Sequence, residues 1–319
     1  MEEILTWAHR QFWGVELPDL RLRRRLVEVA ACIRVNPTGT LPQAVQGTAA
    51  LKGAYRLFSH DGVTHENVVA AHVAQTREQC RKEGEYLLIE DTTALSFSQR
   101  AGIEGLGPLA EENTQGLLVH SCLAARVEQW TRGGEPEVTL EGIFGQECWA
   151  RKAPEGTREE RKKARRKRPG DGIPRESDRW GRALEEAGPP PPGVARTLVA
   201  DRECDIYETM ADCTRRGDGW VIRAAQHRKT LPLDQDIFEG AAQAPVLGVY
   251  EVELRARPGA QARTARVELR AVQVAIRPKR EFQASYAPLE TGLVEVREVD
   301  PPEGTEPVHW LLLTSWPCA

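Results

Sequence analysis

The sequence predicts an α/β protein with an all-helical N-terminal region followed by a mixed sheet with helices. Apolar residues recur at helical spacing in the first part of the chain, as in the segment 20–33. From about residue 85, short apolar runs with strand alternation replace that period. A long alternating stretch at 245–299 then predicts further strands before an apolar run at 308–314. Together these patterns favour helices first and a sheet-based domain afterwards.

The N-terminal region is expected to hold three helices. Asp19 is placed to cap a helix over 20–33, because its carboxylate can accept a hydrogen bond from the first helical turn. A second helix is expected over 41–58 and a third over 64–83, which begins at a Thr-His-Glu-Asn start signal. These helices make up an expected first domain, residues 1–80.

The remainder, residues 81–319, is expected to form one domain with a β-rich insertion at about 225–305. Its expected elements, in chain order, are strands at 85–97, 116–127 and 137–149, a helix at 176–187, a strand ending at 200, a helix at 205–215 and strands at 220–224 and 308–314. Without the insertion, this is the element order of a ribonuclease-H-like fold. In that fold the first and fourth strands are neighbours.

Composition excludes several classes of protein. The chain has 319 residues, 40% of them hydrophobic and 28% charged, which is typical of a globular protein. Its seven cysteines form no Cys-x-x-Cys pair, which argues against a disulfide framework or a zinc ribbon. No apolar run approaches the ~20 residues needed to span a bilayer, and the acidic start lacks a signal-peptide pattern. We therefore expect no membrane association and a cytoplasmic protein.

Two aspartates lie at the ends of apolar runs. Asp91 follows Tyr86–Glu90, and Asp201 follows Thr197–Ala200. Each run reads as a short buried strand that brings a carboxylate to its exposed end. If the two strands were neighbours, their carboxylates would lie within reach of a divalent cation. The alternative, which the pattern alone leaves open, is that each aspartate caps a turn or a helix.

The nearby acids Glu90, Glu203 and Asp205 are expected to be solvated or salt-bridged rather than metal ligands. Asp205 in particular is expected to start the helix that follows it.

The chain resembles the cut-and-paste transposases of the insertion-sequence-four family. The matching motifs, which span nearly the whole chain in order, are Leu17-Pro18-Asp19-Leu20-Arg21, Lys52-Gly53-Ala54-Tyr55-Arg56-Leu57-Phe58, Glu90-Asp91-Thr92-Thr93, Val119-His120-Ser121, Asp201-Arg202-Glu203-Cys204-Asp205-Ile206, Trp220-Val221-Ile222-Arg223, Pro301-Pro302-Glu303-Gly304 and Trp310-Leu311-Leu312-Leu313-Thr314-Ser315. The resemblance implies a helical DNA-binding domain, a ribonuclease-H-like catalytic core with a β insertion, and a C-terminal helical dimerisation region.

The resemblance also implies a chemistry. Members of the family hold Mg²⁺ or Mn²⁺ with two aspartates and a glutamate, and cut and join DNA as homodimers. Asp91 matches the aspartate that bridges both ions, and Asp201 matches a ligand of one. The glutamate belongs to a Tyr-x-x-Arg-x-x-x-Glu pattern after the strand that ends the present sequence at Ala319. We therefore expect a C-terminally truncated chain with impaired catalysis.

The family resemblance assigns DNA contacts to five residues. Arg21, Arg25 and Arg56 match positions that contact the transposon end, and Leu22 stands where the family pattern has a further arginine. Arginine suits this role because its fork pairs with phosphate or guanine through two hydrogen bonds. The alternative for each is a surface salt bridge.

The other two expected contacts are Arg223, with the basic segment 227–229 behind it, and Trp310. Trp310 matches a tryptophan that stacks on a flipped base, and its alternative is a core residue. The basic run 161–168 is a candidate phosphate clamp, with a solvated loop as its alternative.

Three functions compete at this point. The first is a metal-dependent transposase that acts on inverted-repeat ends and target DNA as double-stranded partners. The second is a non-catalytic DNA-binding remnant, or an inhibitor of the full-length enzyme. The third is a metal nuclease unrelated to mobility, which the N-terminal motifs disfavour. A bacterial, nucleoid-associated location is expected for the first two.

Overall fold

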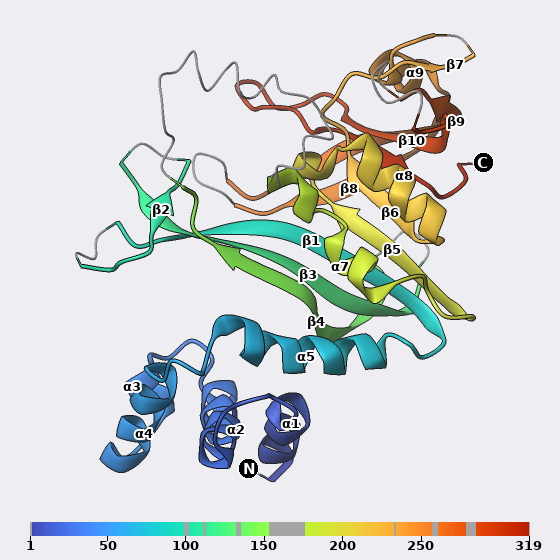
Figure 1. Ribbon diagram of the computed structural model, residues 1–319. Coiled ribbons are helices and arrows are strands. Elements are labelled where there is room, and N and C mark those ends of the chain that lie inside the picture. Colours follow the sequence, from blue (N-terminus) through green and yellow to red (C-terminus); the bar gives the residue numbers. More distant parts are fainter. Residues whose placement is uncertain are drawn as a thin grey trace. The chain divides into compact units, whose positions relative to one another are not determined.

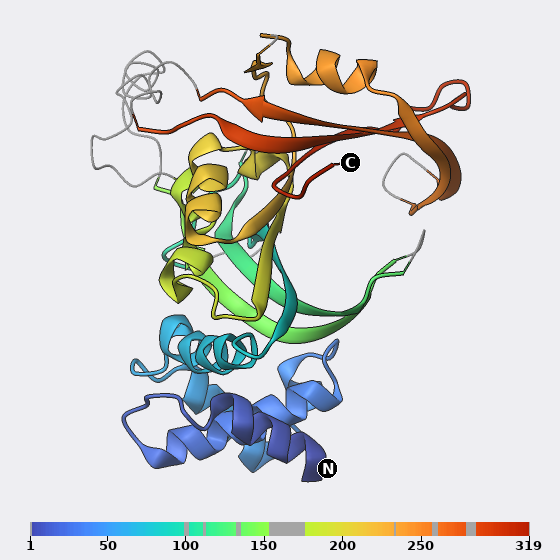
Figure 2. The ribbon, with the colours of Figure 1, turned by 90° about the vertical axis from the view of Figure 1, so that its right-hand side faces the viewer.

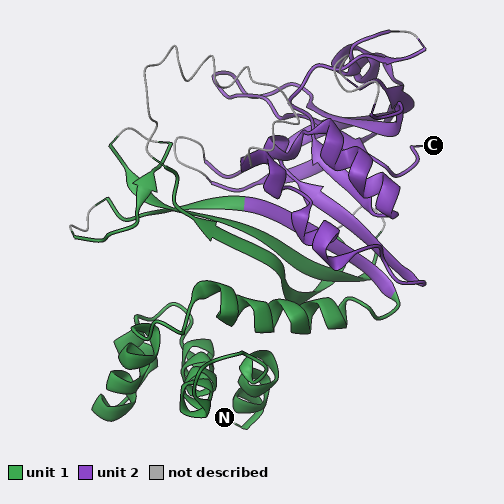
Figure 3. Ribbon diagram, viewed as in Figure 1, with its two compact units in different colours: residues 1–83, 92–169 green, residues 84–91, 170–319 purple. Residues whose placement is uncertain are grey.

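The computed structural model describes residues 2–98, 102–110, 113–131, 135–152, 176–232, 234–256, 261–278 and 285–318. It is a mixed α/β protein with helices at the N-terminus and a large, mostly antiparallel sheet (Figure 1). The chain divides into two compact units (Figure 3). Unit 1 holds residues 1–83 and 92–169, and unit 2 holds residues 84–91 and 170–319. The expected domain boundary after residue 80 stays a prediction.

Unit 1 begins with five helices: α1 (Glu2–Phe12), α2 (Leu20–Val35), α3 (Leu41–Ala44), α4 (Thr48–Phe58) and α5 (His65–Gln79). The expected cap of α2 is confirmed, because Asp19 Oδ1 accepts a hydrogen bond from the Arg21 amide at 2.7 Å. The single helix expected over 41–58 is wrong. It is interrupted at Gly47, whose φ of +90° is incompatible with a continuous helix and favours glycine.

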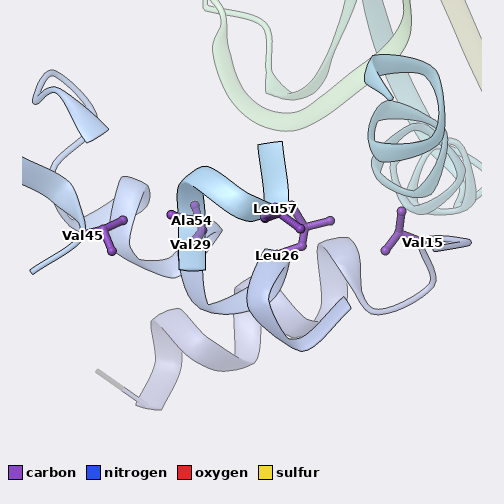
Figure 4. Close-up of a cluster of buried hydrophobic side chains, with 6 residues drawn as sticks. All are labelled: Val15, Leu26, Val29, Val45, Ala54 and Leu57. Carbon is purple, nitrogen blue, oxygen red and sulfur yellow. The ribbon is translucent and has the colours of Figure 1, made fainter. Parts of the chain in front are cut away.

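A small apolar core joins α2 to α4 (Figure 4). Its buried side chains are Val15, Leu26, Val29, Val45, Ala54 and Leu57. Leu26 and Val29 lie three residues apart on α2, and Ala54 and Leu57 lie three apart on α4. Each pair therefore occupies one helix face, and the opposite faces of both helices stay available for polar side chains.

The strands of unit 1 form a hairpin-based sheet. Its members are the end of β1 (Gly84–Ser96), β2 (Gly107–Pro108), β3 (Gln115–Gln129) and β4 (Glu137–Trp149). β3 pairs antiparallel with both β2 and β4, and its other neighbour is β1. The strands expected at 85–97, 116–127 and 137–149 are therefore confirmed.

Helix α5 lies along β4 (Figure 1). The amide of Ile143 donates to His72 Nε2 at 2.9 Å, and His72 Nδ1 lies 2.8 Å from Gln11 Oε1 on α1. The imidazole thus bridges both helices and the strand as a neutral ring, and burial lowers its pKa. Arg77 adds a hydrogen bond to the carbonyl of Phe144 at 2.9 Å.

Among its described residues, unit 2 contains three parallel strands and five antiparallel ones. The start of β1 pairs parallel with β5 (Val194–Ala200), which pairs parallel with β6 (Gly219–Arg223). The sheet continues through β11 (His309–Thr314), β10 (Leu289–Glu298) and β9 (Arg263–Ile276). The short β7 (Thr230–Leu231) and β8 (Val246–Leu254) both pair with β9.

The helical elements of unit 2 are η1 (Glu176–Arg179), α7 (Arg182–Ala187), η2 (Arg202–Cys204), α8 (Tyr207–Arg216) and α9 (Ile237–Gln243). The expected helix at 176–187 is interrupted at Gly181, which has a φ of +74°. The expectation that Asp205 starts the next helix is wrong, because Ile206 is the N-cap of α8. Figure 2 shows α9 lying against β9 and β10.

The expected β-rich insertion is present as β8, β9 and β10, but it does not stand apart from the sheet. β10 pairs antiparallel with β11, and β11 pairs antiparallel with β6. The alternating strands therefore extend one sheet instead of interrupting it. Among the helices that the structure describes, none is both long enough and apolar enough to cross a membrane.

Candidate functional site

Asp91 and Asp201 directly follow the paired stretch of two parallel strands, β1 and β5. Asp201 follows the last residue of β5, whereas Asp91 lies within β1, which continues to Ser96, so the expected strand end at Asp91 is wrong. β1 and β5 pair in register from Gly84 with Val194 to Glu90 with Ala200. The next residue on each strand is the aspartate, and both aspartates are exposed. Because parallel strands place their carboxyl ends at the same edge, the two carboxylates come from adjacent positions. The expectation that the two strands are neighbours is confirmed.

Arg223 lies on the next strand of the sheet, at the position beside Asp201. β5 pairs parallel with β6 up to Ala200 and Ile222, and Arg223 is the residue after Ile222. Asp201 and Arg223 therefore lie at the ends of β5 and β6, and Asp91 lies at the neighbouring position within β1. The half-buried Arg223 makes no ion pair with any residue that the structure describes. A cation beside two exposed carboxylates is a suitable partner for a phosphate that must approach them.

Asp201 also caps a turn. Its Oδ1 accepts a hydrogen bond from the Glu203 amide at 2.8 Å and starts η2. The capping alternative therefore holds for one oxygen of this carboxylate. Capping uses a single lone pair, so the carboxylate keeps acceptor capacity for a second role. The cap also fixes the side chain, which reduces the entropy cost of binding a cation.

The neighbouring acids have structural partners. Glu90 is buried, and its Oε2 accepts a hydrogen bond from the Gly181 amide at 2.9 Å. Asp205 is buried against Arg228, and its Oδ2 accepts hydrogen bonds from the amides of Ala225 and Gln226, each at 2.6 Å. Asp205 is therefore salt-bridged, as the sequence analysis expected of these acids.

The carboxylate oxygens of Asp91 and Asp201 are of the chemical type that binds hard divalent cations. Carboxylate oxygens are the ligands that Mg²⁺ and Mn²⁺ prefer, and both aspartates expose theirs. Over the part of the chain that the structure describes, no group of three His, Cys, Asp or Glu side chains is arranged to hold a metal. The described site thus offers two ligands.

Trp310 packs against apolar side chains. It is half-buried and packs against a cluster that contains Ala265 and Val267 of β9 and Val308, which precedes β11. It lies two residues before Leu312, which pairs with Arg223. The structure thus places Trp310 near the strand-end site and gives it the contacts of a core residue. Its stacking role stays a prediction.

The basic segment behind Arg223 needs a correction. Arg228 was grouped with His227 and Lys229 as a phosphate contact, but its guanidinium is buried and paired with Asp205. Only His227 and Lys229 are exposed. The burial of Arg228 could not be found from the local sequence, because its partner lies 23 residues away. The other candidate clamp, 161–168, lies outside the described residues.

The three expected DNA-contacting arginines of unit 1 have different surroundings. Arg21 is exposed and pairs with Asp19 at 2.8 Å, and its hydrogen bonds lower the pKa of that carboxyl. Arg25 pairs with Glu28 at 2.9 Å. Arg56 is exposed on α4 with no partner among the described residues. Surface pairs of this kind stabilise by only ~0–1 kcal/mol, so DNA can displace them.

The Arg25 side chain reaches α4 at Gly53. A Cβ atom at Gly53 would lie 2.9 Å from Cζ and Nε of Arg25, so the guanidinium crosses α4 at the glycine. Gly53 and Arg56 are three residues apart, and Lys52 is four before Arg56, which puts all three on neighbouring faces. Lys52 was not among the predicted contacts, although its i, i+4 spacing from Arg56 is visible in the sequence.

We predict that Gly53→Ala weakens DNA binding without harming the fold. Alanine is the better helix former by about 1 kcal/mol, so α4 should be as stable or more stable. Its methyl group, however, displaces the Arg25 guanidinium. Titration with duplex DNA should show affinity lower by up to about tenfold, or ~1.4 kcal/mol.

Gly14→Ala is the matched control, since nothing lies within 4 Å of its added Cβ. If both variants bind DNA equally well, the position of Arg25 on α4 does not matter for binding.

The comparisons with known proteins agree with a DNA-binding N-terminus. Residues 4–63, which hold α2, α3 and α4, match the model of the family "Transposase DNA-binding". Among solved structures, the chain matches a piggyBac transposase synaptic complex with hairpin DNA, determined by cryo-EM, with 11% identity and a TM-score of 0.33. That match covers 98% of this chain and 50% of the other, so this chain spans half the length of that protein. The similarity to that structure is too low to transfer a fold. The family match shows that residues 4–63 are similar to a transposase DNA-binding domain.

Proposed function

We propose that this protein is a DNA transposase of the insertion-sequence-four type. In this proposal α2 and α4 bind double-stranded DNA at the inverted-repeat ends, and Asp91 and Asp201 serve strand cleavage and transfer. The observation that carries the proposal is the placement of these two exposed carboxylates at adjacent positions where the β1–β5 pairing ends, with Arg223 at the end of β6. The match of residues 4–63 supports the DNA-binding part.

The strand order supports a ribonuclease-H-like core. In unit 2, β1, β5 and β6 are parallel neighbours, like the first, fourth and fifth strands of such a core. In unit 1, the end of β1 neighbours β3, and β3 pairs antiparallel with β4, like its first three strands.

The proposed chemistry is phosphoryl transfer in two steps. Water attacks a phosphodiester at the transposon end, which breaks the P–O3′ bond and frees a 3′-hydroxyl. That hydroxyl then attacks a phosphodiester of target DNA and displaces its 3′ oxygen. Bound Mg²⁺ or Mn²⁺ would supply Lewis acidity to both steps, held by Asp91 and Asp201. Arg223 would bind the phosphate and balance its charge. A homodimer is part of this proposal, as the family resemblance implies.

A second candidate function is non-catalytic DNA binding, as a remnant or an inhibitor of a full-length enzyme. The observation that favours it is that, among the described residues, no third acid is arranged with the two aspartates to hold a metal ion. Two carboxylates hold a pair of cations more weakly than three.

One experiment separates the two functions. The 319-residue chain is incubated with supercoiled plasmid in Mn²⁺ and in EDTA, and DNA binding is followed in parallel by gel shift. Binding together with Mn²⁺-dependent nicking supports the transposase. Binding without nicking favours the non-catalytic function. Loss of both contradicts the whole proposal.

We predict that Arg56→Ala weakens DNA binding by about tenfold and leaves folding intact. Arg56 is exposed and unpaired among described residues, so its removal costs no folded contact. Loss of one phosphate contact should also reduce the slope of log affinity against log salt by about 1. Arg81→Ala removes one exposed charge outside the matched helices and serves as the control. Equal affinities and slopes for the two variants would remove Arg56 from the interface.

A further inference from the structure

The turn that follows β5 is fastened to the turn that follows β6. The first turn holds Asp201 at its start and Asp205 at its end, and the second runs from Ala224 to Lys229. Asp205 Oδ2 accepts hydrogen bonds from the amides of Ala225 and Gln226, each at 2.6 Å. One carboxylate thus holds two consecutive amides of the neighbouring turn.

Arg228 closes the connection from the second turn. One of its nitrogens pairs with the Asp205 carboxylate, and Nη2 donates to the Asp205 carbonyl at 2.9 Å. The side chains of Asp205 and Arg228 are 0% and 5% exposed. Burying two charges is costly, and here hydrogen bonds on both sides offset the cost. Removal of either partner leaves an uncompensated buried charge.

The connection lies next to the proposed reacting groups. Asp201 stands four residues before Asp205, and Arg223 directly precedes the second turn. The second turn keeps Gln226, His227 and Lys229 exposed. His227 Nδ1 lies 3.0 Å from Asp236 Oδ2, and the amide of Ile237 donates to the Arg228 carbonyl at 3.0 Å. The start of α9 therefore supports the far side of the same turn.

We propose that Asp205 and Arg228 are positioning residues that hold the 224–229 turn against the Asp201 turn. They keep the exposed donors of the turn, Gln226, His227 and Lys229, beside the two aspartates, where the cleaved DNA strand would lie. This inference rests on the proposed function for the role of that edge. The physical connection itself rests only on the contacts of Asp205 and Arg228.

The test uses Fe²⁺ as a probe in place of Mg²⁺. With ascorbate and peroxide, bound iron generates hydroxyl radicals that cut the polypeptide backbone close by, and mass spectrometry locates the cuts. In the wild-type chain we expect cuts near residues 91 and 201 and within 224–229. In Asp205→Asn the cuts within 224–229 should fall to background while those near 91 and 201 persist. A general loss of structure would abolish all of them together.

Glu203→Gln is the matched control, because it neutralises an exposed carboxylate in the same turn and should keep every cut. Undiminished cutting within 224–229 in Asp205→Asn would overturn the inference. Absence of cuts near 91 and 201 in the wild-type chain would instead count against the metal site of the proposed function.

A second readout needs no metal. Trypsin cuts after exposed lysine in proportion to the population of locally open chain, so Asp205→Asn should speed cleavage after Lys229 by roughly tenfold or more. Arg228→Lys keeps the positive charge but cannot contact both the carboxylate and the carbonyl of Asp205 as the guanidinium does. This milder variant keeps the test valid if Asp205→Asn fails to fold. It should show an intermediate rate. Rates equal to wild type in both variants, with circular dichroism unchanged, would overturn the inference.

Discussion

Replacing Asp91 or Asp201 by asparagine is expected to reduce Mn²⁺-dependent plasmid nicking to background. Asparagine keeps the size and one oxygen of aspartate but removes the negative charge that a divalent cation requires. A metal ion contributes several kcal/mol to phosphoryl transfer, which corresponds to a rate loss of roughly a thousandfold or more. Each variant should still bind duplex DNA, because neither substitution lies in residues 4–63, which match the DNA-binding family model.

Glu203→Gln is the control for this prediction. Glu203 is an exposed acid two residues from Asp201, so its replacement changes the local charge equally. It should nick at the rate of the unchanged chain. If the Asp91 and Asp201 variants nick as fast as Glu203→Gln, the two aspartates are not the catalytic groups.

Replacing Asp218 by alanine is expected to cause the largest loss of stability. Its side chain is 0% exposed and pairs with Arg196 at 2.7 Å and Arg216 at 3.2 Å. Arg196 also donates to the carbonyl of Gly188 at 2.6 Å. Removal of the carboxylate takes away a buried partner that two arginines share, at a cost of about 3–5 kcal/mol. Domains of this kind are stable by only ~5–15 kcal/mol.

Urea denaturation measures this effect against Asp212→Ala. Asp212 pairs with Arg215 at 2.9 Å, but the arginine is 71% exposed, so its loss should cost at most about 1 kcal/mol. Equal midpoints for the two variants would contradict the role of the buried network. The network matters for the site because Arg196 lies on β5 and Asp218 directly precedes β6, the strands that end at Asp201 and Arg223.

Much of the fold follows from local pattern. The apolar runs before Asp91 and Asp201 form strands, and these strands pair as neighbours. The break between α3 and α4 was missed because the apolar spacing runs on through Gly47, whose positive φ only the structure reveals. The alternating stretch forms strands as expected, but sequence alternation cannot tell which strands β10 will join.

Some features of the candidate site could likewise be predicted from the sequence, and others could not. The apolar runs before Asp91 and Asp201 mark where the two strands pair, but the sequence does not show that β1 continues past Asp91 to Ser96. The Arg228–Asp205 pair and the contact of Arg25 with Gly53 depend on residues more than twenty positions apart. Such pairs arise from packing between turns and helices, and a single sequence carries no sign of them.

The most direct measurement of the central claim is Mn²⁺ binding, followed by electron paramagnetic resonance, in the unchanged chain and in Asp91→Asn and Asp201→Asn. If the two aspartates share a cation, the unchanged chain binds Mn²⁺ and each single substitution weakens that binding by about tenfold or more. Binding that stays the same in both variants would contradict the metal site and with it the proposed chemistry.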